Sequence, residues 1–432
     1  MSLPFFLASR FYRSAGRDRK RRASKLAIYI AAAGVAVGLA VMIISICVVK
    51  GFQNELRSKL SGFTAHVEVL DVRSFASPES YPIYTPSSLI RQLRQVGNVQ
   101  RVQRVSLKMG ILKTDNAFQN IVLKGVGKDY DLTFIKSQIT RGRFPDLSGE
   151  RNEILISKKQ ASDLGIDIGS KVYAYFFSDD IRMRRFVVTG IYETNFEQFD
   201  DYFVWTDRAT VNKLNGWTEE QSSDLEVYVK DFNYACEDND PMQKNVTYDY
   251  YDPTQQQLVD RLKHCKDPYG GIYNTLSMKK NPRTSSVIQW VSLLDMNVWI
   301  ILGLMGVVAG FTMISGLLIL ILERTQTIGV LKALGATNSR IRQTFIIYAS
   351  LIVVRGLFWG NVLGLGLVVV QKTWGVIKLN PATYHVAEAP VHIDLWWIAG
   401  LNIGTLLLCV LALLIPSLVI SRIRPAKSIR FE

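Results

Sequence analysis

The sequence has few of the residues and motifs on which catalysis and metal binding usually depend. Its four histidines are scattered, at His66, His264, His385 and His392. No Walker A, H-E-x-x-H, C-x-x-C or G-x-S-x-G motif occurs. Residues 124–128 include two glycines but lack the spacing and the Ser or Thr that bind phosphate and magnesium. We therefore expect a non-catalytic chain that binds no metal or cofactor and hydrolyses no ATP itself. An outward-facing enzyme stays open as an alternative, without a constellation of residues to support it.

Cysteine is scarce as well, with four residues in the chain. Cys47 and Cys409 lie within long apolar runs, where we expect them to pack as small apolar side chains. Cys236 and Cys265 lie 29 residues apart in a polar region. An oxidising compartment would favour a disulfide between them. Two free buried thiols are the alternative.

Acidic residues are scarce outside one long segment. Residues 51–297 hold 31 Lys/Arg and 32 Asp/Glu, whereas the other 185 residues hold 20 Lys/Arg and 5 Asp/Glu. The basic excess lies at 10–25, 324–342 and 422–430, and each cluster adjoins an apolar run. Basic residues beside membrane spans mark the cytoplasmic side. We therefore expect both termini in the cytoplasm and residues 51–297 outside. Because the spans account for every basic cluster, nucleic-acid binding is not expected.

Four apolar runs have the length of membrane spans. Each is close to the roughly 20 residues that cross the hydrocarbon core, and they lie at 26–49, 298–322, 345–370 and 396–420. The first is too long for a signal peptide, and no small-residue cleavage site follows it. The predicted fold class is therefore an α-helical membrane protein with four transmembrane helices and a large outward α+β domain between the first two.

Alternating apolar residues predict strands in the outward segment, among them 66–70, 153–157 and 225–229. Residues 171–177 and 183–192 predict a β-hairpin with a charged tip at 178–182. Because 225–229 resumes the first pattern, we expect an inserted β-rich subdomain at about 130–223 and a helical stalk at about 284–297. The complete predicted order is an interfacial helix (1–25), the first span (26–49), the outward domain (50–297), the second span (298–322), a cytoplasmic helix and loop (323–344), the third span (345–370), an outward loop (371–395), the fourth span (396–420) and a cytoplasmic tail (421–432).

Small residues recur at four-residue spacing in the spans, a pattern that permits close approach of helix backbones. The expected packing positions are Gly34, Gly38, Gly306, Gly310, Gly356, Gly360 and Gly364. The frequency of glycine in membrane helices is the alternative explanation. Arg355 lies inside the third span, where an unpaired charge is costly. We expect it to have a packing or gating role rather than to face lipid.

The charged segment between the second and third spans predicts a helix. Ile328, Leu331 and Lys332 fall on one face together with Gly335, and a glycine in this position suits a helix end. A charged helix of this length is too regular for a linker, so we expect a cytoplasmic partner to dock against it. An amphipathic helix resting on the membrane surface is the alternative.

These residues carry a family resemblance. Residues 323–337 read Glu-Arg-Thr-Gln-Thr-Ile-Gly-Val-Leu-Lys-Ala-Leu-Gly-Ala-Thr and resemble the signature of the FtsX-like permeases, membrane subunits of mechanotransmission-type ABC systems. Residues 48–56, 60–66 and 304–315 are similar to motifs of the lipoprotein-releasing permeases within that family, and residues 163–172 fit their outward domain. The resemblance extends over nearly the full chain.

The resemblance implies an inner-membrane permease of a bacterium, with a periplasmic domain made of a porter-like subdomain and a β-rich insertion. Its partners would be an ABC ATPase dimer that uses ATP and Mg, a second permease copy (identical or paralogous), a periplasmic lipoprotein carrier, lipoprotein cargo and membrane lipid. The ATPase-coupling residues would be Glu323, Arg324, Ile328, Leu331, Lys332, Leu334 and Gly335. The carrier contacts would come from Phe177, Asp179, Asp180 and Arg182.

One departure from the family pattern concerns the hairpin. In the family, one permease partner captures the carrier with a proline-containing hairpin, whereas residues 178–182 are short and have no proline. This chain would then be the partner that does not capture the carrier, or recognise the carrier differently, or fill both roles as a homodimer. Two other functions stay open. One is an exporter of the macrolide-transporter type, whose members carry a fused N-terminal ATPase, and the other is a signal relay to a periplasmic hydrolase.

Overall fold

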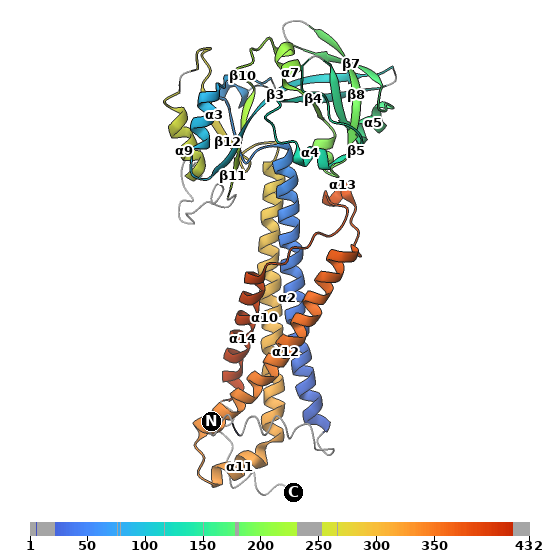
Figure 1. The fold of residues 1–432 in the computed structure, drawn as a ribbon. Helices are drawn as coiled ribbons and strands as arrows, with labels where there is room; N and C mark the ends of the chain where they lie inside the picture. The colour runs from blue at the N-terminus through green and yellow to red at the C-terminus, as the bar shows by residue number, and fades with distance from the viewer. Residues whose placement is uncertain are drawn as a thin grey trace. The chain divides into compact units, whose positions relative to one another are not determined.

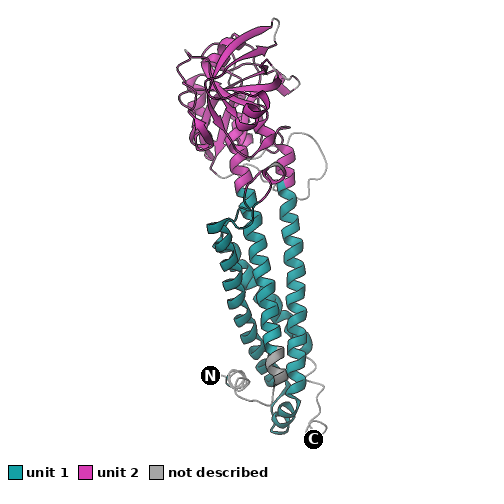
Figure 2. Ribbon diagram, turned by 90° about the vertical axis from the view of Figure 1, so that its right-hand side faces the viewer, with its two compact units in different colours: residues 1–54, 291–378, 388–432 teal, residues 55–290, 379–387 magenta. Residues whose placement is uncertain are grey.

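The structure is a computed structural model of the chain, and it describes Phe6 and residues 22–75, 77, 79–115, 117–149, 151–177, 181–230, 253–265 and 267–417. The chain divides into two compact units (Figure 2). Unit 1 consists of residues 1–54, 291–378 and 388–432, and unit 2 of residues 55–290 and 379–387. The hairpin tip at 178–180, the tail at 421–432 and most of the expected interfacial helix at 1–25 lie outside the described residues.

Unit 1 is built from long apolar helices. Among the described residues, four helices are long and apolar enough to cross a membrane (Figure 1). They are α2 (Arg22–Phe63), α10 (Ser285–Glu323), α12 (Asn338–Trp374) and α14 (Leu395–Ser417). The first two are the longest, at 42 and 39 residues. Helix α2 continues past its apolar run through Glu55, Leu56 and Arg57, which are good helix formers. Helix α10 is unbroken through Asp295 and Asn297, where the sequence places the stalk.

The glycines of α12 lie where two helices approach closely. A methyl group at Gly356 would be 2.8 Å from the carbonyl oxygen of Ala32, and one at Gly360 would be 2.8 Å from that of Ala36. Gly364 faces Ala40 in the same way, at 3.1 Å. These three positions form a stripe against α2, and side chains there would push the helices apart.

The other predicted packing glycines lie in looser surroundings or meet side chains. Gly34 faces Thr312 of α10, whereas Gly38 has only ordinary contacts near 3.8 Å. Gly306 and Gly310 face Leu408 of α14 at 3.3 and 3.5 Å. Arg355 lies on an exposed face of α12, and its role stays a prediction. A polar contact that the sequence analysis did not predict joins α12 to α14, because the side-chain amides of Asn361 and Asn402 exchange hydrogen bonds of 2.7 and 3.1 Å.

Unit 2 contains a mixed sheet whose ten described strands form one continuous surface (Figure 1). The order is β12-β1-β11-β3-β4-β9-β6-β8-β5, with β7 paired to β3 and β8. The strands are β1 (Val67–Asp71), β3 (Val99–Lys113), β4 (Phe118–Val126), β5 (Ile139–Gly142), β6 (Glu153–Ser157), β7 (Lys171–Phe176), β8 (Arg182–Tyr192), β9 (Phe203–Asp207), β11 (Asp224–Val229) and β12 (Tyr273–Ser277). A separate pair is formed by β2 (Ile83–Tyr84) and β10 (Gln221–Ser222).

The strands of the sheet contribute side chains to two separate apolar cores. At one end, β1, β3 and β11 pack with α3 (Ser87–Arg94) and α9 (Pro253–Leu262). At the other end, β4, β6, β7, β8 and β9 pack with α5 (Lys158–Leu164) and α7 (Arg208–Asn215). Strand β11 returns between β1 and β3 and thereby places the strands between residues 139 and 207 at the second end. Strand β3 contributes to both cores, with Val99 and Val102 in the first and Leu112 in the second. The α+β fold class predicted from the sequence is confirmed.

The glycine-containing run at 124–128 contributes Lys124 to the interior of unit 2. Lys124 on β4 is 1% exposed, and its ammonium forms an ion pair of 2.6 Å with Glu226 on β11. It also donates to the carbonyl of Phe63 and lies 4.9 Å from the ring centre of Trp205. Such a charge is tolerated in the interior because it is paired and hydrogen-bonded. Buried in this way, Lys124 cannot contact a nucleotide.

The loop between α12 and α14 contributes residues 379–387 to unit 2, including the short helix α13 (Pro381–Tyr384). Lys59, on the last turns of α2, donates hydrogen bonds to the carbonyls of Thr194 (2.7 Å) and His385 (2.8 Å). The His385 ring meets the edge of Phe196, with ring centres 4.7 Å apart. Through these contacts the loop packs into the same unit as the sheet.

Candidate functional site

The predicted cytoplasmic docking helix is α11 (Thr325–Ala333), which follows α10 after a break at Arg324. Its end is set by Gly335, whose φ of +87° lies in the left-handed region that favours glycine. The amide of Gly335 donates to the carbonyl of Lys332, and that of Ala336 donates to Leu331. Thr337 then accepts a hydrogen bond from the amide of Arg340 and starts α12. The connection is therefore a defined helix-turn-helix.

One face of α11 is packed against the helices of unit 1. Ile328 is fully buried in the apolar core that includes Leu320, Ile341 and Phe345, and Leu331 packs against the same core. Two residues predicted to couple to a partner therefore face inward. Lys332 lies between the packed and exposed faces, and burial lowers the pKa of its ammonium. Glu323, at the end of α10, has one buried carboxylate oxygen without a hydrogen-bond partner among the described residues.

The opposite face of α11 is exposed and apolar. Leu334 is 78% exposed, and Val330, four residues earlier, is 49% exposed. Residues four apart lie on the same side of a helix, so these two side chains present one patch, which we call the α11 surface. Val330 was not among the predicted coupling residues, although its four-residue spacing from Leu334 indicates that both side chains lie on one helix face. Arg324 and Gly335 flank the patch at the two ends of the helix.

A second exposed surface lies on the outer face of β3, β4, β7 and β8. The register pairs Lys113 with Phe118 and with Tyr173, and Tyr175 with Met183, so these side chains share one side of the sheet. The alternate residues of the same strands are buried in the core beneath. Large apolar side chains are exposed here, and we call this surface the hairpin face; its members are Met109, Phe118, Tyr173, Phe177, Ile181 and Met183.

Next to the hairpin lies an open cavity of about 340 Å³, lined in part by Met109, Asn120 and Phe177. Of the predicted carrier contacts, Phe177 is 49% exposed at its edge. Arg182 instead donates a hydrogen bond of 2.8 Å to the carbonyl of Leu214, so its side chain holds the hairpin to α7. Asp179 and Asp180 lie outside the described residues. Exposed apolar groups in such numbers mark interaction surfaces on soluble domains.

Charged and aromatic side chains meet at one end of the spans within unit 1. The ammonium of Lys50 on α2 lies 3.7 Å from the carboxylate of Asp295 on α10 and 5.4 Å from the ring centre of Trp397 on α14. Trp299 approaches the same tryptophan with ring centres 6.4 Å apart. Trp and Lys side chains at a span end are typical of the membrane–water interface.

The described residues contain no group of three or more His, Cys, Asp or Glu side chains placed to hold a metal ion. Cys236 lies outside them, so its disulfide with Cys265 stays a prediction. The sulfur of Cys265 lies 3.5 Å from the carbonyl oxygen of Arg261, and burial raises the pKa of its thiol. Cys47 and Cys409 are buried in the helix core of unit 1.

Comparison with known proteins covers both units. A family model described as the MacB-like periplasmic core domain matches residues 29–240, and one described as the FtsX-like permease C-terminal domain matches residues 299–425.

Similar whole proteins include the lipoprotein-releasing system transmembrane protein LolC of Xylella fastidiosa (strain Temecula1), 20% identical with 92% of each chain covered. LolC of Neisseria meningitidis serogroup B is 22% identical and covers 93% of this chain and 94% of its own. LolE of Haemophilus influenzae is 23% identical over 99% of both. The resemblance seen in the sequence motifs is thus confirmed over nearly the full length: the chain combines a MacB-like periplasmic core domain, matched at 29–240, with an FtsX-like permease C-terminal domain, matched at 299–425.

Proposed function

We propose that this chain is the membrane subunit of an ABC transporter that extracts lipoproteins from the outer leaflet of the bacterial inner membrane and passes them to a periplasmic carrier. The observation that supports this most is the similarity, over nearly the full length, to proteins named as lipoprotein-releasing system transmembrane proteins. The positive-inside rule supports an orientation with α11 in the cytoplasm and the sheet of unit 2 outside.

The energy would come from a separate ATPase dimer that binds ATP and Mg and docks on the α11 surface. An exposed Leu334 and Val330 on a short, capped helix suit the apolar groove of a partner. Arg324 and Lys332 would add charge contacts at the edge of that patch. A second permease copy, identical or paralogous, would complete the transporter.

The structure suggests how movement of α11 would be relayed. Ile328 and Leu331 pack into the helix core of unit 1, so α11 cannot shift without moving the helices it contacts. Helix α10 precedes it directly and runs for 39 residues, which at 1.5 Å per residue is about 58 Å. Its first residues belong to unit 2. A displacement at α11 would therefore reach the outward domain along a single helix.

The carrier would dock on the hairpin face. A lipoprotein carrier has to offer an apolar surface for acyl chains, and the hairpin face exposes Phe118, Phe177 and Met183 beside basic residues such as Lys113 and Arg185. This assignment does not require the proline-containing tip of the family, since the contacts come from the faces of the strands.

Reconstituted transfer tests the proposal. The chain, its ATPase and a lipoprotein would be placed in proteoliposomes, and ATP-dependent release to the soluble carrier would be measured. Phe118→Ser combined with Met183→Ser should reduce release at least about tenfold, because each buried apolar side chain contributes roughly 1.5–3 kcal/mol. Ile272→Ser, which changes an exposed apolar residue elsewhere in unit 2, should leave release unchanged. Equal release by all variants would show that the hairpin face is not the carrier site.

An exporter of the macrolide-transporter type is the second candidate, and the match to the MacB-like periplasmic core domain favours it. The two functions differ in cargo. An exporter would transport drugs or peptides without releasing lipoprotein to a carrier. ATP-dependent drug efflux from the same proteoliposomes, with no lipoprotein release, would favour the exporter.

A further inference from the structure

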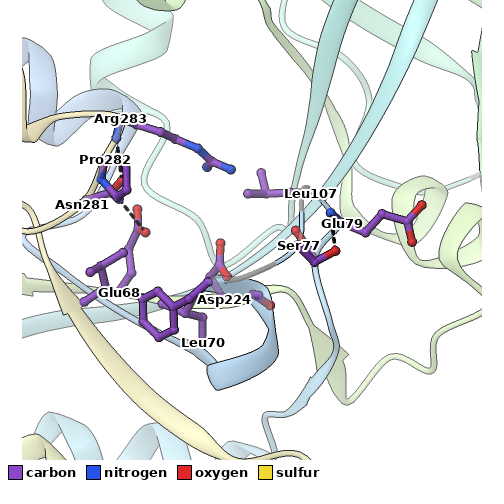
Figure 3. A pocket seen from close by; sticks show the side chains of 13 residues that line it. Glu68, Leu70, Ser77, Glu79, Leu107, Asp224, Asn281, Pro282 and Arg283 are labelled. Atoms are coloured by element: carbon purple, nitrogen blue, oxygen red, sulfur yellow. Dashed lines mark hydrogen bonds between the residues drawn. The ribbon is translucent and has the colours of Figure 1, made fainter.

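Unit 2 contains a second cavity, of about 140 Å³ (Figure 3), which shares Glu79 and Ser80 with the cavity beside the hairpin face. Its apolar wall includes Leu70, Phe75, Leu107 and Leu276. Its polar wall includes Glu68 on β1, Asp224 on β11 and Arg283, which lies two residues before α10 begins. Glu79 and several serines complete that wall. Glu68, Asp224 and Arg283 come from segments far apart in sequence and are brought together by the β1–β11 pairing and by the turn that follows β12.

The two carboxylates are close neighbours on one side of the sheet. Glu226 on β11 lies opposite Glu68, and Asp224 lies opposite Leu70, so Glu68 and Asp224 are diagonal neighbours. Diagonal cross-strand pairs are separated by roughly 7–8 Å. Glu68 is 7% exposed and Asp224 is 8% exposed. The strand register thus holds two nearly buried acids at the wall of one cavity.

Their hydrogen bonding is incomplete. Glu68 accepts one hydrogen bond of 3.0 Å from the side-chain amide of Asn281. The Asp224 carboxylate accepts none within the described parts of the chain, although it is more than nine-tenths buried and points into the cavity (Figure 3). A buried polar group without a partner costs roughly 1–3 kcal/mol, and more when it is charged. An occupant that donates hydrogen bonds would remove this cost.

The nearby cations do not neutralise the two acids directly. Lys124 is engaged by Glu226 at 2.6 Å. Arg283 extends its guanidinium toward the middle of the cavity (Figure 3), and it forms no ion pair with either acid in the regions the structure covers. The cavity therefore presents two acceptors on one side and a planar, five-donor cation on another.

We propose that this cavity binds a small zwitterion of the amino-acid type, whose ammonium lies between Glu68 and Asp224 and whose carboxylate pairs with Arg283. The size fits, because a dry cavity of about 150 Å³ holds a benzene molecule, which has six non-hydrogen atoms, and alanine has the same number. The apolar wall would accept a short aliphatic side chain. The inference does not depend on the proposed transport function.

The protonation of the site supports this assignment. Burial raises the pKa of Glu68 to about 8 and that of Asp224 to about 7. The negative charge of Glu226 raises both pKa values further, whereas the positive charges of Arg283 and Lys124 lower them. At neutral pH the cavity therefore holds a proton that a ligand ammonium would displace. Binding at pH 7 should release protons, which calorimetry in two buffers of different ionisation enthalpy measures.

Isothermal titration of the full chain in detergent at pH 7 tests the proposal, with L-alanine, methylammonium and acetate as probes. We expect saturable binding of L-alanine with proton release, and binding of either single-charge probe at least about tenfold weaker, as expected when one charged hydrogen-bonded partner is missing. Asp224→Asn and Arg283→Gln should each weaken L-alanine binding by at least about tenfold. Asp163→Asn, which changes an exposed carboxylate on α5, should have no effect.

Asp224→Asn preserves the shape of the side chain and removes a buried charge, so folding should be retained; if that variant does not fold, Arg283→Gln decides. The proposal is wrong if L-alanine gives no saturable heat, if methylammonium binds as tightly as L-alanine, or if L-alanine binds without releasing protons. It is also wrong if Arg283→Gln binds L-alanine with unchanged affinity. None of these results would affect lipoprotein release, which is measured separately.

Discussion

Replacing Leu334 by Asp separates the docking role of α11 from its structural role. The side chain is 78% exposed, so the change should alter the free energy of unfolding by no more than about 0.5 kcal/mol. If the ATPase buries this leucine, the variant loses the roughly 1.5–3 kcal/mol of a buried leucine side chain. That loss corresponds to an increase in Kd of about 10- to 150-fold.

The assay is titration of the detergent-solubilised chain with its purified ATPase, together with thermal unfolding of the chain alone. Ile272→Asp is the matched control, because Ile272 is 62% exposed and belongs to unit 2, whereas the proposed docking surface belongs to unit 1. Ile328→Ala provides the contrast. It removes a fully buried side chain, so it should destabilise the chain by about 2–5 kcal/mol.

The reasoning about α11 fails if Leu334→Asp leaves the ATPase affinity unchanged while the unfolding temperature is also unchanged. It fails equally if Leu334→Asp lowers the unfolding temperature as much as Ile328→Ala does, because the side chain would then be part of the packed core. Weakened binding with unchanged stability is the expected result.

Three further predictions concern stability, each followed by unfolding of the full chain in detergent. Lys124→Met should lower the free energy of unfolding by about 3–5 kcal/mol, because it leaves Glu226 buried without its cation. Adding Glu226→Gln to Lys124→Met should recover much of that loss. A double variant no more stable than the single one would contradict this prediction. Gly356→Val should destabilise by about 1–3 kcal/mol by crowding Ala32, whereas Gly366→Val, with no atom within 4 Å of the added carbon, should be tolerated; equal effects would count against close packing of α2 and α12. Because the pKa of Glu68 is raised to about 8, the folded state holds a proton that the unfolded state releases, so the free energy of unfolding should fall as the pH rises from 5 to 8. The slope is at most about 1.4 kcal/mol per pH unit per group. Glu68→Gln should flatten this slope, and an unchanged slope would refute the prediction.

The membrane helices could be predicted from the sequence because a span needs a long apolar run whatever surrounds it. Several strands and helices of unit 2 could also be predicted, since residues 153–157 and 158–164 carry their patterns locally and form β6 and α5. Ser157 and Gln160 form a capping box, a four-residue pattern that marks the start of α5 in the sequence. Local propensity therefore accounts for elements whose neighbours do not have to be known.

Non-local pairing is what the sequence analysis could not supply. The alternation at 225–229 indicates a strand but does not specify that it lies between β1 and β3, and so it does not place Asp224 beside Glu68. The same limit applies to α11. Ile328 and Leu331 have the spacing of an exposed docking face, yet contacts with Ile341 and Phe345 of α12 bury Ile328 and leave Leu334 outside. Lys124 likewise looks like a surface lysine until Glu226 is brought to it across the sheet.

The most direct test of the proposed function is the location of lipoproteins after depletion of this chain in living cells. Inner and outer membranes would be separated on a density gradient, and an outer-membrane lipoprotein would be followed by immunoblotting. The lipoprotein-release function predicts that this lipoprotein accumulates in the inner membrane and that expression of the unmodified chain restores its sorting. Unchanged lipoprotein distribution, together with altered resistance to drugs or peptides, would contradict it.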